Sequence, residues 1–375
     1  FIAGADVSEF GQVREPSAAV PSIRAAHGVL QRLEDLPFPT VAAINGYCLG
    51  GGLELAMACR HRVCADDPKV VLGLPEVMLG IHPGFGGTVR AVQLMGVATA
   101  MDLMLTGKNL RPDKALQAGL VDEIVPAEQL RDAAKKLALR PRKRRKAPLS
   151  QRVLNLPVVR GLVAGKIESQ VRRRVRKEHY PAPYAIVDLW RRHGASPRTG
   201  YEAEAQSVAR LVCTSTSRNL VRVFFLQERL KGLGGKEPPA GGHVHVVGAG
   251  VMGGDIAAWC ALRGFTVTLQ DRSTEFVQPA LDRARVFFEK RSRVPGRAAE
   301  QLARLQADVA GHGVERADVV IEAIYENAEA KRELYARLEP RLKSGALLAT
   351  NTSSIPLAPP ADRPPAPRRA PRPPS

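Results

Sequence analysis

The chain has 375 residues, 45% of them hydrophobic, a length that allows two or three domains with cores of their own. No apolar run approaches the ~20 residues of a membrane-spanning helix, so we expect no membrane span. The five cysteines are odd in number and show no CxxC or metal-ligand spacing. This usage argues against a disulfide scaffold or a metal site and favours a reducing compartment.

The formal net charge of +18 invites a nucleic-acid-binding interpretation. The basic residues concentrate in Arg140–Lys146, in Arg172–Lys177 and near the C-terminus. No nucleic-acid-binding motif or interleaved aromatic stripe accompanies them, and aromatic residues make up only 5% of the chain. We therefore expect no nucleic-acid partner. A small substrate that carries phosphates accounts for part of the charge, and arginine-rich coding bias for more.

The first part of the chain alternates strands and helices. Phe1–Asp6 reads as the end of a buried strand, so we expect a fragment whose beginning is missing. Further segments are predicted as a helix at Ser22–Leu36, a strand at Val41–Ile44, helices at Leu53–Arg60, Ala91–Leu105 and Pro112–Ala118, and a strand at Val121–Val125. This alternation predicts an α/β domain over residues 1–139.

Two glutamates, Glu54 and Glu76, lie beside the glycine clusters of this domain, Gly50–Gly52 and Gly84–Gly87. A glycine turn between a strand and a helix exposes N–H groups at the positive end of the helix dipole. Such groups stabilise a carbonyl oxygen that becomes negative during reaction. We therefore predict acyl chemistry, with the Gly51 N–H as an oxyanion donor and the two glutamates as an acid/base pair. The alternative is tight packing at the glycines and two solvated glutamates.

Residues 140–233 have helical periodicity, clearest at Tyr201–Leu211 and Ser217–Leu230, which predicts a helical connector packed against both neighbours. Residues 234–242 are rich in glycine and proline and predict a linker. The linker marks the boundary of a second α/β domain.

The second domain opens with a dinucleotide fingerprint. A strand at Val244–Val247 runs into the glycine turn Gly248–Gly253, a helix over Gly254–Arg263 follows, and the next strand, Thr266–Leu269, ends near Asp271. The glycines allow a tight turn and close approach of a pyrophosphate to the helix N-terminus. Asp271 can bind the ribose hydroxyls of a dinucleotide, and an acidic residue at this position favours NAD over NADP. The pattern predicts an incomplete NAD-binding Rossmann domain over residues 243–357.

Further along, strands are predicted at Asp318–Ala323 and Leu347–Asn351 and a helix at Glu329–Leu338. Polar residues at the carboxyl ends of strands in an open α/β sheet face the ligand crevice. Glu326, Lys331 and Ser353 are therefore candidate site residues. Residues 358–375 contain only Ala, Pro, Asp, Arg and Ser, which predicts a disordered tail and suggests a frameshift or an artificial end.

Residues 1–357 resemble the middle of the multifunctional fatty-acid β-oxidation protein, in which a crotonase-type enoyl-CoA hydratase/isomerase is fused to 3-hydroxyacyl-CoA dehydrogenase. The matching segments are, in order, IAGAD, INGYCLGGGLELA, LGLPEVMLGIHPGFGGT, LRPDKALQAGLVDE, VVGAGVMGGDIA, IEAIYEN and ATNTSS. The order hydratase-then-dehydrogenase is similar to the bacterial alpha subunit. The resemblance implies an α/β protein with a crotonase-type (spiral ββα) domain, a helical connector and a Rossmann domain.

The resemblance also implies roles. The thioester carbonyl of a trans-2-enoyl-CoA would lie between the N–H groups of Ala5 and Gly51. Glu54 would activate water for attack at C3, and Glu76 would deliver a proton to C2 and shuttle it during isomerisation. For the second domain, the residues implied to bind NAD are Gly248, Gly250, Gly253, Asp271, Glu326 and Lys331. Ser353 would contact the hydroxyl region of the substrate.

The resemblance breaks off where the family's catalytic histidine would follow, because this chain has only the Pro/Arg tail there. It therefore implies that the dehydrogenase step is lost. A thiolase subunit is the implied partner of the full-length parent, and the bacterial cytoplasm is favoured over the peroxisome, since the chain does not end in an SKL-like signal. Two alternatives stay open: an inactive fragment or assembly module that keeps CoA and NAD affinity, and a basic RNA-binding protein.

Overall fold

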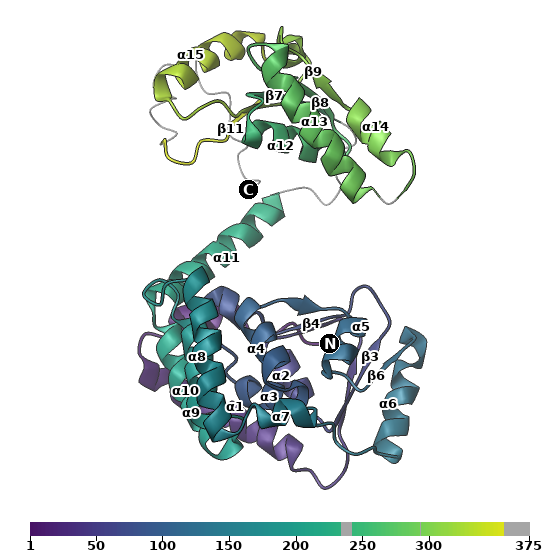
Figure 1. The fold of residues 1–375 in the computed structure, drawn as a ribbon, viewed down its shortest axis with the longest axis vertical. Helices are drawn as coiled ribbons and strands as arrows, with labels where there is room; N and C mark the ends of the chain where they lie inside the picture. The colour runs from purple at the N-terminus through teal and green to yellow at the C-terminus, as the bar shows by residue number, and fades with distance from the viewer. Residues whose placement is uncertain (234–241, 293, 356–375) are drawn as a thin grey trace, which may run out of the picture. The chain divides into compact units, whose positions relative to one another are not determined.

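The computed structural model describes residues 1–233, 242–292 and 294–355, and the chain forms two compact units, Phe1–Gly234 and Gly235–Ser375 (Figure 1). Each unit has hydrophobic clusters of its own. The predicted linker, 234–242, lies outside the described residues apart from Gly242, and the predicted tail, 358–375, lies outside them altogether.

Two three-stranded sheets lie in the first unit. In one, the central β3 (His61–Ala65) pairs in parallel with β1 (Val41–Ile44) and β6 (Glu123–Val125). In the other, β4 (Val71–Gly73) pairs in parallel with β2 (Tyr47–Leu49) and antiparallel with β5 (Asn109–Leu110). β1 and β2 follow each other directly, so the chain passes from one sheet to the other just before the glycine turn at residues 50–52.

Helices pack around these sheets (Figure 1). They are α1 (Pro16–Glu34), α2 (Gly51–Ala58), α3 (Gly87–Met95), α4 (Val97–Thr106), α5 (Pro112–Ala118) and α6 (Leu130–Leu139), with short 3-10 turns η1 (Val7–Gln12), η2 (Pro75–Leu79) and η3 (Ala127–Gln129). The single helix predicted over Ala91–Leu105 is instead two, α3 and α4. Gly96, with φ 84° and ψ 171°, separates them because this backbone conformation cannot continue a helix.

The segment predicted as a connector is helical and belongs to the same compact unit. Its helices are α7 (Leu149–Val153), α8 (Pro157–Arg174), α9 (Ala182–His193), α10 (Pro197–Val212) and α11 (Ser215–Leu233). Trp190 of α9 and Val208 of α10 are buried in one cluster with Leu53 and Met57 of α2. Because these side chains share a core, α9 and α10 form part of the environment of the residues that follow the glycine turn.

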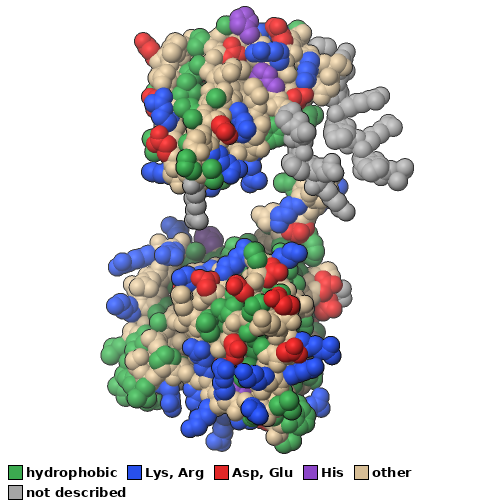
Figure 2. All heavy atoms as spheres, turned by 90° about the vertical axis from the view of Figure 1, so that its right-hand side faces the viewer, with side chains coloured by type: hydrophobic (Ala, Val, Ile, Leu, Met, Phe, Trp, Pro, Cys, Tyr) green, Lys and Arg blue, Asp and Glu red, His purple; other side chains and the backbone are tan. Residues whose placement is uncertain are grey.

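Basic side chains are spread over the visible face of the first unit and do not form a single stripe (Figure 2). Several residues of the run 140–146 bind acceptors within the unit. Arg142 forms an ion pair with Glu123, Arg144 forms one with Glu34, and Arg145 donates to the Val121 carbonyl. Part of this basic run therefore serves internal contacts.

The second unit is built on one parallel sheet of five strands in the order β11-β10-β7-β8-β9. The strands are β7 (His243–Val247), β8 (Thr266–Gln270), β9 (Leu305–Ala307), β10 (Val319–Glu322) and β11 (Leu347–Thr350). From β7 the chain adds strands first on one side and then on the other. The strand order reverses between β7 and β10, which is where sheets of this kind bind ligands.

Both faces of this sheet are covered, as an all-parallel sheet requires. The helices are α12 (Val251–Leu262), α13 (Thr274–Arg291), α14 (Arg297–Ala303) and α15 (Ala328–Leu338), with 3-10 turns η4 (His312–Glu315) and η5 (Glu339–Arg341). Val246 packs in a cluster with α12 and α13, whereas the next residue, Val247, packs in a cluster with α15. The predicted α/β class with a Rossmann-like second domain is confirmed. No helix in the described part of the chain is long and apolar enough to cross a membrane.

Candidate functional site

The glycine turn predicted as an oxyanion site lies between β2 and α2. Gly50 has φ 52° and ψ −127°, and a Cβ atom there would lie 3.2 Å from Oε1 of Glu76. Both the positive φ and the close carboxylate therefore favour glycine at this position. Gly51 is the first residue of α2, so its N–H belongs to the helix-terminal amides that have no intrahelical acceptor.

The N-terminal segment runs alongside this turn. Ile2 forms a parallel bridge with Cys48, and its carbonyl accepts a hydrogen bond of 3.0 Å from the Leu49 N–H. A Cβ atom at Gly50 would lie 3.9 Å from the Cα atom of Gly4. Ala5 directly follows Gly4, so the structure brings the two predicted oxyanion donors, Ala5 and Gly51, onto neighbouring segments.

Glu54 is buried one turn into α2, with 2% of its surface exposed. Its Oε1 accepts hydrogen bonds of 2.7 Å from both the Phe85 N–H and the Gly87 N–H. A Cβ atom at Gly87 would lie 2.6 Å from that oxygen, so the contact requires glycine. Burial, together with the negative charges of Glu76 and Glu204, raises the pKa of Glu54 well above its usual value, despite the two hydrogen bonds.

Glu76 lies in η2, beside the glycine turn. Both of its carboxylate oxygens are buried and have no hydrogen-bond partner among the described residues. Burial, with a contribution from the charge of Glu204, raises the pKa of Glu76 to about 8. Glu76 is therefore protonated at neutral pH and can donate a proton, whereas Glu54 is held by two donors that favour its ionised form.

A third buried carboxylate belongs to Glu204 of α10, a residue that the sequence analysis did not single out. It accepts hydrogen bonds from the Gly86 N–H at 2.6 Å and the Thr88 N–H at 3.0 Å. Nε2 of His27, in α1, lies 2.9 Å from Oε1 of Glu204. The sequence carried one signal, since Glu204 shares a helix face with Val208 and Leu211, four and seven positions later.

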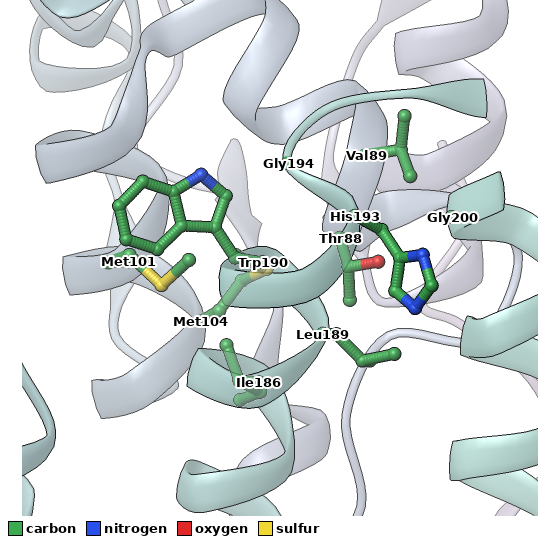
Figure 3. A pocket seen from close by; sticks show the side chains of 10 residues that line it. All are labelled: Thr88, Val89, Met101, Met104, Ile186, Leu189, Trp190, His193, Gly194 and Gly200. Atoms are coloured by element: carbon green, nitrogen blue, oxygen red, sulfur yellow. The ribbon is translucent and has the colours of Figure 1, made fainter. Parts of the chain in front are cut away.

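A small cavity adjoins this region between α3, α4 and α9 (Figure 3). Thr88 lies on its wall, while Met101, Met104 and Trp190 supply apolar side chains. Its volume of about 10 Å³ holds no more than one water molecule. This cavity is thus a packing gap, and neither Glu54 nor Glu76 lines it. No group of three His, Cys, Asp or Glu placed to hold a metal occurs in the described residues.

In the second unit the three fingerprint glycines have different surroundings. A Cβ atom at Gly248, where φ is 108°, would lie 2.5 Å from the Ala323 carbonyl oxygen, and one at Gly253 would lie 1.8 Å from the Gly248 oxygen. A Cβ atom at Gly250 would meet nothing within 4 Å. Packing therefore explains glycine at 248 and 253 but not at 250, which lies next to the first amides of α12. Open space at a helix N-terminus fits a pyrophosphate.

Asp271 lies at the end of β8, as predicted, and one of its oxygens accepts a hydrogen bond of 2.7 Å from the Ala249 N–H. The carboxylate is therefore tied to the glycine turn itself. Its other oxygen accepts from the Arg272 N–H, also at 2.7 Å. A carboxylate fixed at this edge is placed to accept hydrogen bonds from ribose hydroxyls.

Glu326, Lys331 and Ser353, which follow β10 and β11, come together at the same edge of the sheet. Oε1 of Glu326 accepts hydrogen bonds from the N–H groups of Ser353 and Ser354, each at 3.1 Å. Hydrogen bonds from Thr352 and Ser354 lower the pKa of Glu326 to about 2. Nζ of Lys331 lies 3.5 Å from the other Glu326 oxygen.

Lys331 is buried, with 1% of its surface exposed, against a carboxylate that the sequence analysis did not identify. Its Nζ lies 2.6 Å from Oε1 of Glu322, the last residue of β10. Oε2 of Glu322 accepts hydrogen bonds from the Tyr335 hydroxyl at 2.9 Å and the Thr350 hydroxyl at 2.6 Å. The Lys331 charge is thus compensated inside the protein, where burying it alone would be costly.

Two protein families match two different parts of the chain. Residues 1–168 match the family described as enoyl-CoA hydratase/isomerase, and residues 243–369 match the NAD-binding domain of 3-hydroxyacyl-CoA dehydrogenase. The first match contains Glu54 and Glu76, and the second contains the glycine fingerprint. The predicted crotonase-type and NAD-binding domains, in that order, are confirmed.

Three solved structures resemble part of the chain. 3-Hydroxybutyryl-CoA dehydrogenase from Escherichia coli is 34% identical over 32% of this chain and 26% of its own, with a TM-score of 0.31. FadB2 of Mycobacterium tuberculosis is 30% identical over 32% of this chain and 43% of its own, with a TM-score of 0.30. (S)-3-hydroxybutyryl-CoA dehydrogenase from Ralstonia eutropha is 31% identical over 30% of this chain and 41% of its own, with a TM-score of 0.29. The chain therefore spans less than half the length of each.

Proposed function

We propose that this chain, which joins an enoyl-CoA hydratase/isomerase domain to the NAD-binding domain of a 3-hydroxyacyl-CoA dehydrogenase, hydrates trans-2-enoyl-CoA thioesters in fatty-acid β-oxidation. The observation that carries the proposal is the contrast between two buried carboxyl groups. Glu54 accepts two backbone hydrogen bonds, whereas the oxygens of Glu76 have no partner in the described part of the chain. Burial raises the pKa of both groups, but only Glu54 has backbone donors that stabilise a negative charge, so Glu54 is the better base and Glu76 the better acid for the addition of water.

The hydration follows from these protonation states. Ionised Glu54 takes a proton from water, and the water oxygen forms a bond to C3 of the enoyl thioester. The electron pair of the C2–C3 double bond moves toward the thioester oxygen, which the N–H groups of Ala5 and Gly51 stabilise. Neutral Glu76 then gives its proton to C2, and the product is a 3-hydroxyacyl-CoA. Moving a double bond along the chain would use Glu76 alone, which removes a proton from one carbon and returns it to another.

The second unit contributes an NAD-binding domain. We propose that the α12 N-terminus beside Gly250 holds the pyrophosphate and that Asp271 binds the ribose hydroxyls. Bound NAD would supply a hydride acceptor for a 3-hydroxyacyl substrate. Ser353 contacts the substrate hydroxyl in this proposal, and the Glu326 carboxylate fixes the turn that carries Ser353.

Four inferences from the sequence remain predictions. They are the division at residues 139 and 233, the loss of the dehydrogenase step, the thiolase partner and the bacterial cytoplasm. Oxidation of 3-hydroxybutyryl-CoA with NAD by the purified chain would contradict the predicted loss of the dehydrogenase step. Failure to copurify with a thiolase would count against the predicted thiolase partner.

The proposed hydration is tested with the purified chain and crotonyl-CoA. We expect the absorbance of the conjugated thioester to fall as water adds, with turnover above that of a heat-denatured sample. Binding of crotonyl-CoA without any loss of absorbance would contradict the proposal and would favour a binding or assembly module instead. RNA binding with a steep salt dependence, unaffected by CoA, would favour the alternative of a basic RNA-binding protein.

A further inference from the structure

Four consecutive backbone amides at the start of α3 are divided between two carboxylates from different parts of the chain. In the segment Phe85–Thr88, the first and third N–H groups donate to Glu54, and the second and fourth donate to Glu204. The donor–acceptor distances lie between 2.6 and 3.0 Å. Because the first amides of a helix have no intrahelical acceptor, these two carboxylates satisfy them from opposite sides.

Glu204 is itself fixed in place. Its side chain is completely buried, and it accepts a hydrogen bond from the Thr88 hydroxyl as well as from the amides. Nε2 of His27 lies 2.9 Å away, and the His27 ring stacks on Tyr201 with the ring centroids 5.1 Å apart. Burial would raise the pKa of Glu204, but hydrogen bonds from His27 and Thr88 outweigh it and lower that pKa. Glu204 therefore keeps its negative charge in an interior position.

We propose that Glu204 is a positioning residue of the hydratase site, which holds the Phe85–Thr88 turn so that two of its amides stay directed at Glu54. This inference rests on the proposed hydration and deepens it. It also makes α10 part of the proposed hydratase site, although α10 lies beyond residues 1–168, which match the hydratase family. Glu204 touches no reacting atom in this scheme and acts through Glu54.

The charge of Glu204 has a second effect, which a purely structural residue would lack. It contributes to the raised pKa of both Glu54 and Glu76. Removing the charge therefore lowers both values, so both limbs of a bell-shaped pH profile should move to lower pH. The titratable groups that face this cluster are His27 of α1, Glu54 of α2, Glu76 of η2, His82 before α3, Arg90 of α3 and Tyr201 of α10.

The test compares two substitutions at Glu204 in the full chain, with crotonyl-CoA as substrate. Glu204→Gln keeps the shape but removes the charge, so kcat should fall roughly tenfold with KM nearly constant, and both limbs should move to lower pH. Glu204→Asp keeps the charge but is too short to reach both amides, so kcat should fall while the limbs stay in place. Glu202→Gln is the matched control, since Glu202 lies on the same helix in an exposed ion pair with Arg24 and should behave as wild type.

Wild-type kcat in both Glu204 variants would overturn the inference, and so would a fall in kcat for Glu204→Gln with unmoved limbs. If Glu204→Gln does not fold, Glu204→Asp decides, because wild-type kcat in that variant overturns the positioning role. An NMR titration of carbon-13-labelled glutamates separates this inference from the proposed function. It should show a lower Glu54 pKa in Glu204→Gln even in a chain that does not hydrate crotonyl-CoA, and an unchanged pKa would overturn the inference.

Discussion

The candidate sites of the two units differ in how they treat their buried carboxylates. In the first unit, Glu54 and Glu76 have no cationic partner among the residues that the structure describes, and burial raises the pKa of each. In the second, the Glu322 carboxylate is also buried, but hydrogen bonds from Lys331, Thr350 and Tyr335 outweigh burial and lower its pKa. The pKa of a buried glutamate is thus raised at Glu54 and Glu76 and lowered at Glu322, as it also is at Glu204, which supports Glu54 in the first unit.

This difference separates proton transfer from binding. A carboxyl group whose pKa lies near neutrality changes its protonation state at little cost, as an acid or base catalyst must. A carboxylate that is hydrogen-bonded and paired keeps a fixed charge and instead orients its neighbours. The first unit is therefore suited to moving protons on a substrate, whereas the second is suited to holding a cofactor and the turn that carries Ser353.

The largest effect that tests this comparison is on hydration. Replacing Glu54 by glutamine keeps the shape but removes the base, so the rate of crotonyl-CoA hydration should fall roughly 100- to 10,000-fold. Stopped-flow or steady-state absorbance measures the rate, and Glu202→Gln serves as an exposed control. Near-normal hydration by the Glu54→Gln variant would show that this carboxylate is not the base.

The next effect is on stability, and it has opposite signs in the two units. Replacing Glu322 by glutamine removes the closer of the two carboxylates that pair with the buried Lys331 ammonium and should lower the free energy of unfolding by about 3 kcal/mol. Glu76 has a folded pKa of about 8 against 4.5 unfolded, so between these values it ionises only in the unfolded chain, and the fold loses stability as pH rises from 4.5 toward 8. Replacing Glu76 by glutamine should therefore raise the unfolding free energy at pH 8 by roughly 1 to 3 kcal/mol, with a gain that disappears below pH 4.5.

Denaturant titrations at pH 5 and pH 8 measure both changes. Two losses of similar size, independent of pH, would show that the carboxylates of the two units do not differ in the way described.

A smaller effect distinguishes binding from packing within the second unit. An alanine at Gly250 places its Cβ in open space, so stability should be unchanged while NAD affinity falls about tenfold as the methyl group crowds the pyrophosphate. An alanine at Gly253 would overlap the Gly248 carbonyl and should lower the unfolding free energy by about 1 to 3 kcal/mol. Calorimetric titration with NAD and thermal unfolding separate the two, and undiminished NAD affinity in Gly250→Ala would place the pyrophosphate elsewhere.

The parts of this molecule that the sequence predicts are those whose contacts are local. The turn at Gly50–Gly52 and the fingerprint at Gly248–Gly253 each join a strand to the next helix, so spacing alone identifies them. The break at Gly96 was missed because the apolar periodicity continues through it, and only the backbone conformation shows that α3 and α4 are separate.

The support of the site could not be predicted in the same way. The hydrogen bond between Gly86 and Glu204 joins residues 118 positions apart, and the contact between His27 and Glu204 spans 177 positions. A glutamate on an apolar helix face indicates that the side chain is buried, but it does not show which groups form hydrogen bonds with the carboxylate. Lys331 was likewise predicted at the cofactor edge, while its buried pairing with Glu322 depends on how α15 packs against β10.

The most direct measurement is the pH dependence of kcat/KM for crotonyl-CoA hydration by the wild-type chain. Activity requires an ionised Glu54 and a protonated Glu76, so it should fall on the acid side as Glu54 gains a proton and on the alkaline side, near pH 8, as Glu76 loses the proton that it must donate. In Glu76→Gln the residual activity should lack the fall near pH 8. A profile that stays flat from pH 5 to pH 9, or one unchanged by Glu76→Gln, would contradict the assignment of proton transfer to these two glutamates.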